Sequence, residues 1–393
     1  MDLDRLRAET PGCAHRVHLN NAGASLMPDR VLEAVRGHLE LEAELGGYEA
    51  AAEAAGRIEA AYGAVADLLG TSPGNVAFTE HATAAFVQAL SSVPLQAGDV
   101  VLTTRNDYVS NQIQYLSLSE RLGVEVMHAP DAAEGGVDLQ AMEELIHRRR
   151  PRLVAVTHVP TNSGLVQDVG AIGAMCRERD VLYLVDACQS VGQMPVHPDS
   201  LGCDFLSATA RKFLRGPRGA GFLWVSDRAL EAGFSPLFPD LRGADWVEGD
   251  LFQPAPDARR FETWEFSWGL VLGTGEAARY ALEVDLEEIR ERTRALAGEL
   301  RRGLGEVPGV RILDRGPDLC AIVTAAVHGW LPKDLVLALR QRGINTSAQT
   351  RLDAVLDFDA KGVDGALRIS PHYFNTAHDL DTLLDALREL ARA

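Results

Sequence analysis

The chain has 393 residues, of which 46% are hydrophobic and 24% are charged. This length suits one large domain together with a smaller one, with enough apolar residues for substantial cores. Acidic residues outnumber basic residues by 56 to 38, which gives a formal net charge of −18. So negative a chain is poorly suited to bind nucleic acid or an anionic membrane, and we expect neither as a partner.

The cysteines and the first residues of the chain indicate a cytoplasmic protein. The five cysteines are scattered without the paired spacing of a metal site, so no metal is expected and a reducing compartment is favoured. Residues 1–7 lack the apolar core of a signal peptide. No apolar run approaches the roughly 20 residues that span a bilayer.

Amphipathic helical patterns over residues 29–44 and 49–69 come first, and strands and helices then alternate. Strands are predicted at 75–79, 100–104, 124–128, 153–159, 182–186, 205–208 and 221–225. Helices are predicted between them at 83–90, 110–121, 139–148 and 172–179. Short apolar runs alternating with helices predict an α/β fold, with a mostly parallel seven-stranded sheet covered on both faces.

Beyond residue 270 the pattern changes to a smaller α+β portion. A long helical stretch covers 275–304, strands are predicted near 310–313, 321–324 and 367–370, and helices at 333–342 and 380–391. We therefore divide the chain into three parts. Residues 1–28 are an N-terminal segment contributing to the small domain and the active site, 29–270 the large domain, and 271–393 the small C-terminal domain.

Lysine is scarce, with Lys212, Lys333 and Lys361 as the only examples. Lys212 lies between a predicted strand and a Gly-Pro-Arg-Gly turn, and Asp186 ends an earlier apolar strand. An amine that forms a Schiff base and an acid that keeps a pyridine nitrogen protonated are what pyridoxal phosphate (PLP) requires. The alternatives are a surface lysine and a helix-capping acid. Lys333 opens a helical pattern and Lys361 lies in a turn-like stretch, so both are expected to be solvated.

A phosphate site is predicted where the strand at 75–79 meets the next helix. Backbone N–H groups and the helix dipole at such a junction attract an anion. Any strand–helix junction has this property, so the junction alone is a weak signal. The residues expected around the phosphate are His81, Ala82, Thr83, Thr209 and Arg211.

Several segments together resemble the class V, fold-type I PLP enzymes, a family that includes cysteine desulfurases, isopenicillin N epimerase and C–S lyases. The segments are residues 18–25, 107–111, 157–164, 185–192, 211–219 and 367–375. Their order and spacing make the resemblance specific, and it covers nearly the whole chain. It implies a fold-type I transferase fold and a homodimer whose active sites are shared between subunits.

The resemblance implies a role for each matching cofactor residue. Lys212 would carry the Schiff base, Asp186 would pair with the pyridine nitrogen, and Gln189 would reach the phenolic oxygen. Thr161 or Asn162 would lie near the ring.

The resemblance also implies the substrate contacts. Arg368 matches the arginine that grips the substrate carboxylate, a role suited to its two-pronged guanidinium; the alternative is a structural salt bridge. Tyr108 takes the position of the histidine that stacks over the ring in desulfurases, and counts with Lys212 and Asp186 as catalytic. Asn21, in the first matching segment, is placed among the substrate-binding residues.

Two departures from the family pattern bear on the reaction. Desulfurases carry a nucleophilic cysteine on a mobile loop shortly after the segment matching 343–345, whereas residues 346–351 here contain none. Cys320 lies upstream in an apolar strand pattern and is expected to be buried and inert. Persulfide-forming desulfurase activity is therefore not expected.

The second departure is the segment 260–268, where desulfurases have a Gly-Thr-Pro phosphate loop supplied by the partner subunit. Trp264 and Glu265 replace that chemistry here. They could line the entrance to a site for a larger or cationic substrate through stacking and charge pairing. The alternative is a packed dimer interface.

These observations predict a PLP-dependent C–S lyase acting on an amino acid. Lys212 would remove the α-proton, and β-elimination from a cysteine S-conjugate or sulfoxide would give pyruvate and ammonia. An aminotransferase and an isopenicillin N epimerase-like enzyme share the first steps and remain alternatives, as does a non-catalytic PLP-binding protein. A Rossmann-type oxidoreductase is disfavoured because no Gly-x-Gly-x-x-Gly follows the first strand.

Overall fold

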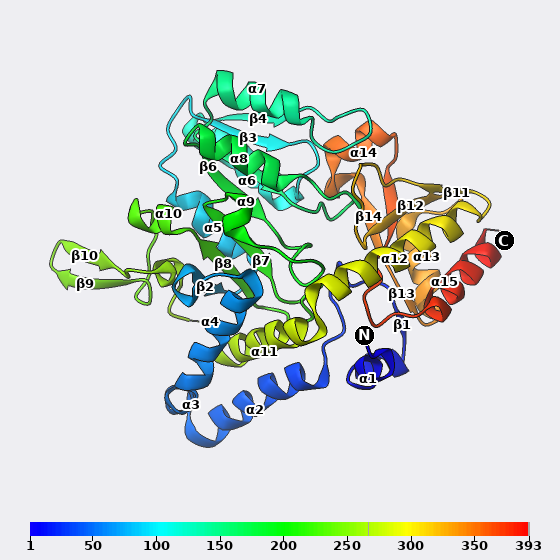
Figure 1. Ribbon diagram of the computed structural model, residues 1–393, viewed down its shortest axis with the longest axis horizontal. Coiled ribbons are helices and arrows are strands. Elements are labelled where there is room, and N and C mark those ends of the chain that lie inside the picture. The colour runs from blue at the N-terminus through cyan, green and yellow to red at the C-terminus, as the bar shows by residue number, and fades with distance from the viewer. Residues whose placement is uncertain (266, 392–393) are drawn as a thin grey trace.

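The computed structural model describes residues 1–265 and 267–391, and a seven-stranded sheet forms its centre (Figure 1). The strand order is β2-β8-β7-β6-β5-β3-β4. Strand β8 runs antiparallel to β2 and β7, and the other pairings are parallel. The predicted mostly parallel seven-stranded α/β sheet is therefore confirmed. Its strands are β2 (Val76–Thr79), β3 (Val100–Thr104), β4 (Glu125–Ala129), β5 (Leu153–Thr157), β6 (Leu182–Asp186), β7 (Phe205–Thr209) and β8 (Gly221–Val225).

Helices cover both faces of this sheet because its strands are apolar on both sides. Along β5, Val154 and Val156 join one buried cluster, which contains residues of α4, α7 and α8. Leu153 and Ala155 join another, which contains residues of α5 and α6. Alternate side chains of a strand point to opposite faces, so each face has its own core. The helices of this part are α2 (Asp29–Leu45), α3 (Gly47–Glu53), α4 (Ala55–Leu69), α5 (Ala82–Ser92), α6 (Val109–Leu122), α7 (Leu139–Arg149), α8 (Val169–Glu178), α9 (Pro198–Leu201), α10 (Asp227–Glu231) and α11 (Trp268–Val284).

A smaller antiparallel sheet of four strands, in the order β11-β12-β15-β14, forms a second unit. The N-terminal strand β1 pairs with β13, so the beginning of the chain joins this C-terminal unit (Figure 1). The strands are β1 (Val17–His18), β11 (Val310–Ile312), β12 (Val323–Val327), β13 (Ile344–Asn345), β14 (Ser347–Thr350) and β15 (Gly365–Ile369). The helices are α1 (Leu3–Ala8), α12 (Leu286–Gly305), α13 (Pro332–Gln341), α14 (Val355–Lys361) and α15 (Ala377–Leu390).

A hairpin of β9 (Ala244–Glu248) and β10 (Leu251–Pro254) projects from the body of the molecule (Figure 1). Its large apolar side chains are solvent-exposed, as shown by Trp246 at 79% and Phe252 at 53% exposure. Within residues 1–265 and 267–391, no helix combines the length and apolar character needed to cross a membrane.

Two predicted helices are interrupted in the structure. The pattern over 275–304 breaks at Asp285, which has a φ of 80° and separates α11 from α12. Its side chain accepts hydrogen bonds from the backbone N–H groups of Glu287 and Glu288, so it caps α12. The pattern over 49–69 likewise divides at Ala54 into α3 and α4. The division of the chain at residues 28 and 270 stays a prediction.

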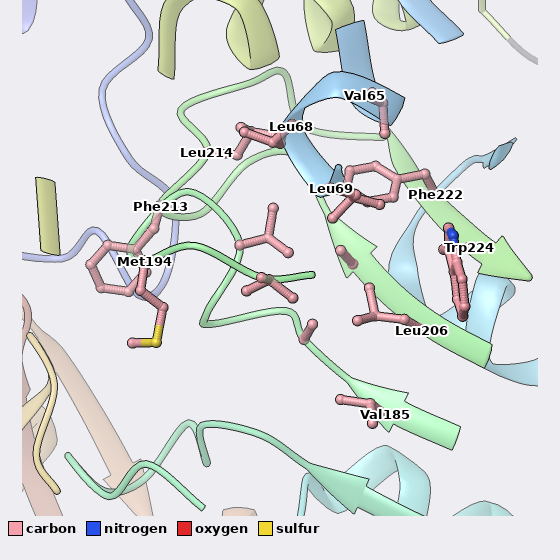
Figure 2. Packing of buried hydrophobic residues seen from close by; sticks show 14 of the residues in the cluster. Val65, Leu68, Leu69, Val185, Met194, Leu206, Phe213, Leu214, Phe222 and Trp224 are labelled. Atoms are coloured by element: carbon pink, nitrogen blue, oxygen red, sulfur yellow. The ribbon is translucent and has the colours of Figure 1, made fainter. Parts of the chain in front are cut away.

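The loop after β7 is anchored by the core beneath it (Figure 2). Phe213 and Leu214 are buried in the same cluster as Leu68 of α4 and Phe222 of β8. Gly192 crosses so close to this loop that a Cβ would lie 2.3 Å from the backbone nitrogen of Leu214, and its φ is 82°. Only glycine is tolerated there. The packing of this loop therefore fixes the position of Lys212, the residue before Phe213.

Candidate active site

Lys212 and Asp186 meet at the carboxyl ends of neighbouring parallel strands, where ligands bind in open α/β sheets. Asp186 is the last residue of β6, and Lys212 follows the end of β7. Lys212 is 7% exposed, and its Nζ lies 5.8 Å from the centroid of the Tyr108 ring. The structure thus brings these three predicted residues together, and their roles toward a cofactor stay predictions.

The surroundings of Lys212 favour its neutral amine. Burial lowers the pKa of Lys212, and the nearby charges of Arg211 and Arg368 lower it further, while Cys188 and Asp186 act in the opposite direction. A neutral amine is the form that attacks an aldehyde. The site thus prepares the lysine for Schiff-base chemistry.

The carboxylate of Asp186 is held by two donors. Oδ1 accepts from the backbone N–H of Cys188 at 3.0 Å, and Oδ2 accepts from Asn111 Nδ2 at 3.1 Å. The same amide nitrogen lies 3.2 Å from Asp107 Oδ1. Asn111 therefore fixes the orientation of Asp186, a role that the sequence analysis did not assign to it.

Asp107 is a second buried carboxylate that the sequence analysis left without a role. It is 4% exposed, and burial raises its pKa, with the nearby charge of Asp186 also acting upward. Its side chain accepts hydrogen bonds from Thr103 Oγ1, Tyr108 N, Asn111 Nδ2, Gln112 Nε2 and Thr157 Oγ1. Because each of these five hydrogen-bond partners donates, the position requires a group that accepts. Asp107 is the first residue of the segment 107–111, which resembles the family, and this was the signal in the sequence that could have identified it as a site residue.

The predicted phosphate site lies at the start of α5. The first intrahelical hydrogen bond runs from Ala85 N to His81 O. The backbone N–H groups of Ala82 and Thr83 lie before this bond and therefore have no acceptor within the helix. The ring of His81 accepts from Ala84 N at 2.9 Å and caps the helix. The helix start is thus available to an anion, and contacts of His81, Ala82 and Thr83 with a phosphate stay predictions.

Two further predicted phosphate ligands lie between β7 and Lys212. Thr209 Oγ1 donates to Ala220 O at 3.4 Å, and the Arg211 guanidinium donates to Gly23 O. Both side chains are engaged with backbone carbonyls in this structure. Their phosphate contacts stay predictions.

Thr161 links the two groups expected to face the phenolic oxygen and the substrate carboxylate. Its Oγ1 accepts from Arg368 at 2.6 Å and from Gln189 Nε2 at 3.0 Å. The Nε of Arg368 and the Oε1 of Gln189 are buried without a partner among the described residues. Burial lowers the pKa of Arg368 to about 10, and the charge of Arg211 acts the same way. Unpaired buried polar atoms are costly, which indicates that a bound group supplies their partners.

Asn20 is a contact of Arg368 that the sequence analysis missed, with its Oδ1 3.4 Å from the guanidinium. The neighbouring Asn21 donates to Ser370 O at 2.7 Å and accepts from Ser25 Oγ at 2.6 Å. Its side chain therefore joins the N-terminal segment to the residue after β15. Direct substrate binding by Asn21 stays a prediction.

The contacts of Asn162 and the exposure of the two other lysines complete the set of predicted positions. Asn162 Nδ2 donates to Asp357 at 2.7 Å, and its contact with a cofactor stays a prediction. Lys333 is exposed, as predicted. The prediction that Lys361 is solvated is wrong, because its side chain is only 6% exposed and pairs with Asp357 at 2.7 Å. The two residues lie one turn apart on α14, a helix that the sequence analysis did not predict.

Trp264 and Glu265 are exposed in the single chain. Trp264 N donates to Asp240 at 2.8 Å, and the guanidinium of Arg242 lies 5.5 Å from the Trp264 ring. Phe266 of the same segment lies outside the described residues. An entrance role for Trp264 and Glu265 stays a prediction.

The arrangement fits PLP. A buried amine with a lowered pKa, an oriented carboxylate, an open helix start and two unpartnered buried polar atoms surround one region. These are the groups that would hold the aldehyde, the pyridine nitrogen, the phosphate and the polar substituents of the cofactor.

Comparisons with known proteins also indicate a PLP-dependent enzyme. A probable hercynylcysteine sulfoxide lyase of Mycobacterium tuberculosis is 31% identical, over 98% of this chain and 92% of that protein. A probable cysteine desulfurase of Pyrococcus abyssi is 26% identical, over 99% of this chain and 97% of that protein. The apo structure of a cysteine desulfurase from Thermococcus onnurineus has a TM-score of 0.89 at 25% identity, covering 99% of this chain and 98% of that one.

The cystine C–S lyase C-DES in complex with its product cysteine persulfide has the same fold, with a TM-score of 0.86 at 22% identity, covering 97% of this chain and 99% of that one. The model of the family "Aminotransferase class-V" matches residues 17–383. The chain therefore belongs to the class V aminotransferase family and is a PLP-dependent enzyme.

Proposed function

We propose that the enzyme is a C–S lyase, which eliminates sulfur from the β-carbon of a cysteine S-conjugate or its sulfoxide and releases pyruvate and ammonia. The observation that carries this proposal is the combination of a buried amine, Lys212, with a partly unpaired guanidinium, Arg368, and no cysteine in residues 346–361. The site can bind an amino acid and remove its α-proton, but it lacks the loop thiol that accepts sulfur in a desulfurase. The relative named as a sulfoxide lyase supports the same reaction class.

Each step can be assigned to a side chain of this chain. Arg368 binds the substrate carboxylate through its unpartnered Nε, while Thr161 and Asn20 hold the other end of the guanidinium. Lys212 would take the proton from Cα as general base. When bound, PLP would supply an electron sink for the electrons left on Cα, and Asp186 would keep its pyridine nitrogen protonated.

The elimination then balances without an added oxidant or reductant. The Cα–H bond breaks with transfer of the proton to Lys212, and the Cβ–S bond breaks with its electron pair leaving on sulfur. A conjugate releases a thiol, and a sulfoxide releases a sulfenic acid. The remaining 2-aminoacrylate takes up water and becomes pyruvate and ammonia.

The cysteines near this region are poorly suited to carry sulfur. Cys320 is fully buried, as predicted, and burial raises its pKa to about 12. Cys188 lies beside Asp186, and burial together with that carboxylate raises its pKa well above the ordinary value. The thiolate is the reactive form of cysteine, so both thiols are held in the unreactive form.

The reaction type is tested by product analysis. We expect a cysteine S-conjugate or sulfoxide to give pyruvate and one equivalent of the released sulfur fragment. An amino acid with 2-oxoglutarate is expected to give no glutamate, and a chiral amino acid incubated alone is expected to keep its configuration. Glutamate without pyruvate would show an aminotransferase, inversion at Cα would show an epimerase, and no turnover with bound PLP would show a non-catalytic protein.

We also propose that the enzyme acts as a homodimer with shared active sites. The exposed apolar side chains of the β9–β10 hairpin and the exposed indole of Trp264 support this, because such groups gain by burial against a second copy. Light scattering is expected to give twice the chain mass. Trp246→Glu is expected to weaken the dimer, and a monomer at micromolar concentration with full activity would contradict the proposal.

A further inference from the structure

A buried ionic cluster joins α14 to two loops of the large sheet. Asp357 accepts hydrogen bonds from Lys361 Nζ at 2.7 Å, from Asn162 Nδ2 at 2.7 Å and from Asn106 Nδ2 at 3.3 Å. Asn106 follows β3 and Asn162 follows β5, whereas Asp357 and Lys361 precede β15 of the small sheet. One carboxylate therefore connects the two sheet units.

The cluster is almost sealed from water. The side chains of Asp357 and Lys361 are 12% and 6% exposed, and Asn106 and Asn162 are 6% and 0% exposed. The Oδ1 atoms of both asparagines have no partner among the described residues, so the bonds to Asp357 are what orient the two amides. A buried ion pair is seldom the most stabilising solution, since apolar residues would pack as well. What it provides is a defined geometry.

That geometry bears directly on the active site. Asn106 lies two residues before Tyr108, and Asn162 follows Thr161, which receives the guanidinium of Arg368. The helix α14 leads directly into β15, the strand that carries Arg368. Asp357 thus holds the loops bearing Tyr108 and Thr161 and the start of the Arg368 strand at one point.

The segment before α14 is also fixed. Asp353 accepts hydrogen bonds from the backbone N–H and the hydroxyl of Thr350 at 2.7 and 2.9 Å, and β14 pairs with β15. Arg351 pairs with Asp359 of α14, with Nη2 and Oδ2 2.7 Å apart. Residues 346–361, which contain no cysteine, form a strand, a turn and a short helix that contacts the loops after β3 and β5.

We propose that Asp357 and Lys361 form a latch between the two sheet units, which fixes residues 346–361 against the loops after β3 and β5 and sets the position of Arg368 relative to Lys212. Both are positioning residues, because they act through Asn106, Asn162 and the Arg368 strand. The inference rests on the proposed role of Arg368 in binding the substrate carboxylate.

The test compares Lys361→Met with Lys333→Met in the holoenzyme. Both changes remove one lysine charge from the small unit, but Lys333 is exposed at the start of α13. For Lys361→Met we expect faster backbone hydrogen exchange in residues 346–361 and also in both asparagine loops, because Asp357 loses its charge partner. We expect KM to rise by about tenfold or more while kcat changes much less, since ground-state placement of the carboxylate is affected first. Lys333→Met is expected to change neither quantity.

Exchange confined to α14, with KM unchanged, would reduce the cluster to a local helix pair and overturn the latch. If Lys361→Met does not fold, the double variant Asp357→Leu/Lys361→Met removes both buried charges, and the same loop exchange is expected from it. The exchange experiment needs no substrate. A failure of the carboxylate role would appear as an unchanged KM in Arg368→Gln, with the loop exchange of the latch variant still present.

Discussion

Asn111 donates a hydrogen bond from Nδ2 to the carboxylate of Asp186 at 3.1 Å, and this bond orients the acid assigned to the pyridine nitrogen. Asn111→Ala is expected to weaken PLP retention by about 10- to 100-fold, as for loss of a hydrogen bond to a charged group. The dissociation of PLP followed by absorbance measures this.

Asn75→Ala provides the matched control. Asn75 is also buried and donates to a carboxylate, that of Asp227 at 2.7 Å. It lies before β2, at the opposite end of that strand from the helix start of α5 in the candidate site. It is expected to lower the melting temperature without changing the dissociation of PLP from folded protein. Equal loss of PLP from both variants would show that Asn111 acts only through general stability.

Arg368→Gln is expected to raise KM for amino-acid substrates by about 10- to 100-fold, because a charge-assisted contact to the carboxylate is lost. An inhibitor of the same shape without the carboxylate serves as the control, and its binding is expected to change little. If both ligands weaken equally, Arg368 acts on the structure of the site through Thr161 and not on the carboxylate.

Glu262 predicts a pH dependence of stability. It is 1% exposed and accepts from Tyr62 Oη at 2.7 Å and from Phe78 N at 2.8 Å, and burial raises its pKa from 4.5 to about 7. Between these values the unfolded chain loses a proton that the folded protein keeps. The contribution of Glu262 to stability is therefore full below pH 4.5 and falls as pH rises to 7, by on the order of 3 kcal/mol.

Urea unfolding of the wild type and Glu262→Gln at pH 5 and pH 8 measures this effect. The glutamine does not titrate, so the free energy of unfolding of the wild type relative to the variant is expected to decrease between the two pH values. A difference that stays constant or increases would contradict the assignment.

Cys320→Ala is expected to leave turnover unchanged, because burial raises the pKa of this thiol and keeps it protonated. Pyruvate release measures turnover, and mass spectrometry of the protein after turnover is expected to show no persulfide. A persulfide on Cys320 or Cys188 would indicate a desulfurase and contradict the lyase proposal.

The seven-stranded sheet could be predicted from the sequence because its strands are short apolar runs separated by helical patterns. The meeting of Lys212 with Asp186 followed from that prediction, since parallel strands end at one edge. The interruption at Asp285 could not be predicted, because it depends on one non-glycine residue adopting a positive φ inside a charged helical pattern.

The long-range polar contacts could also not be predicted from the sequence. Asp357 and Lys361 have the spacing of an ordinary exposed helix pair, and only the packing of α14 against the loops after β3 and β5 buries them. The network of Asp107 has the same character, because its donors come from three separate segments. Local patterns predict elements, whereas such contacts depend on how the elements dock.

Mapping the lysine that binds PLP is the decisive test of the site formed by Lys212 and Asp186. The holoenzyme is reduced with borohydride, digested and analysed by mass spectrometry, and the chain offers only Lys212, Lys333 and Lys361 as candidates. We expect a pyridoxyl group on Lys212, none on the other two lysines, and no visible absorbance of a lysine Schiff base in Lys212→Ala. A pyridoxyl group on Lys361 or Lys333, or retained absorbance in Lys212→Ala, would contradict it.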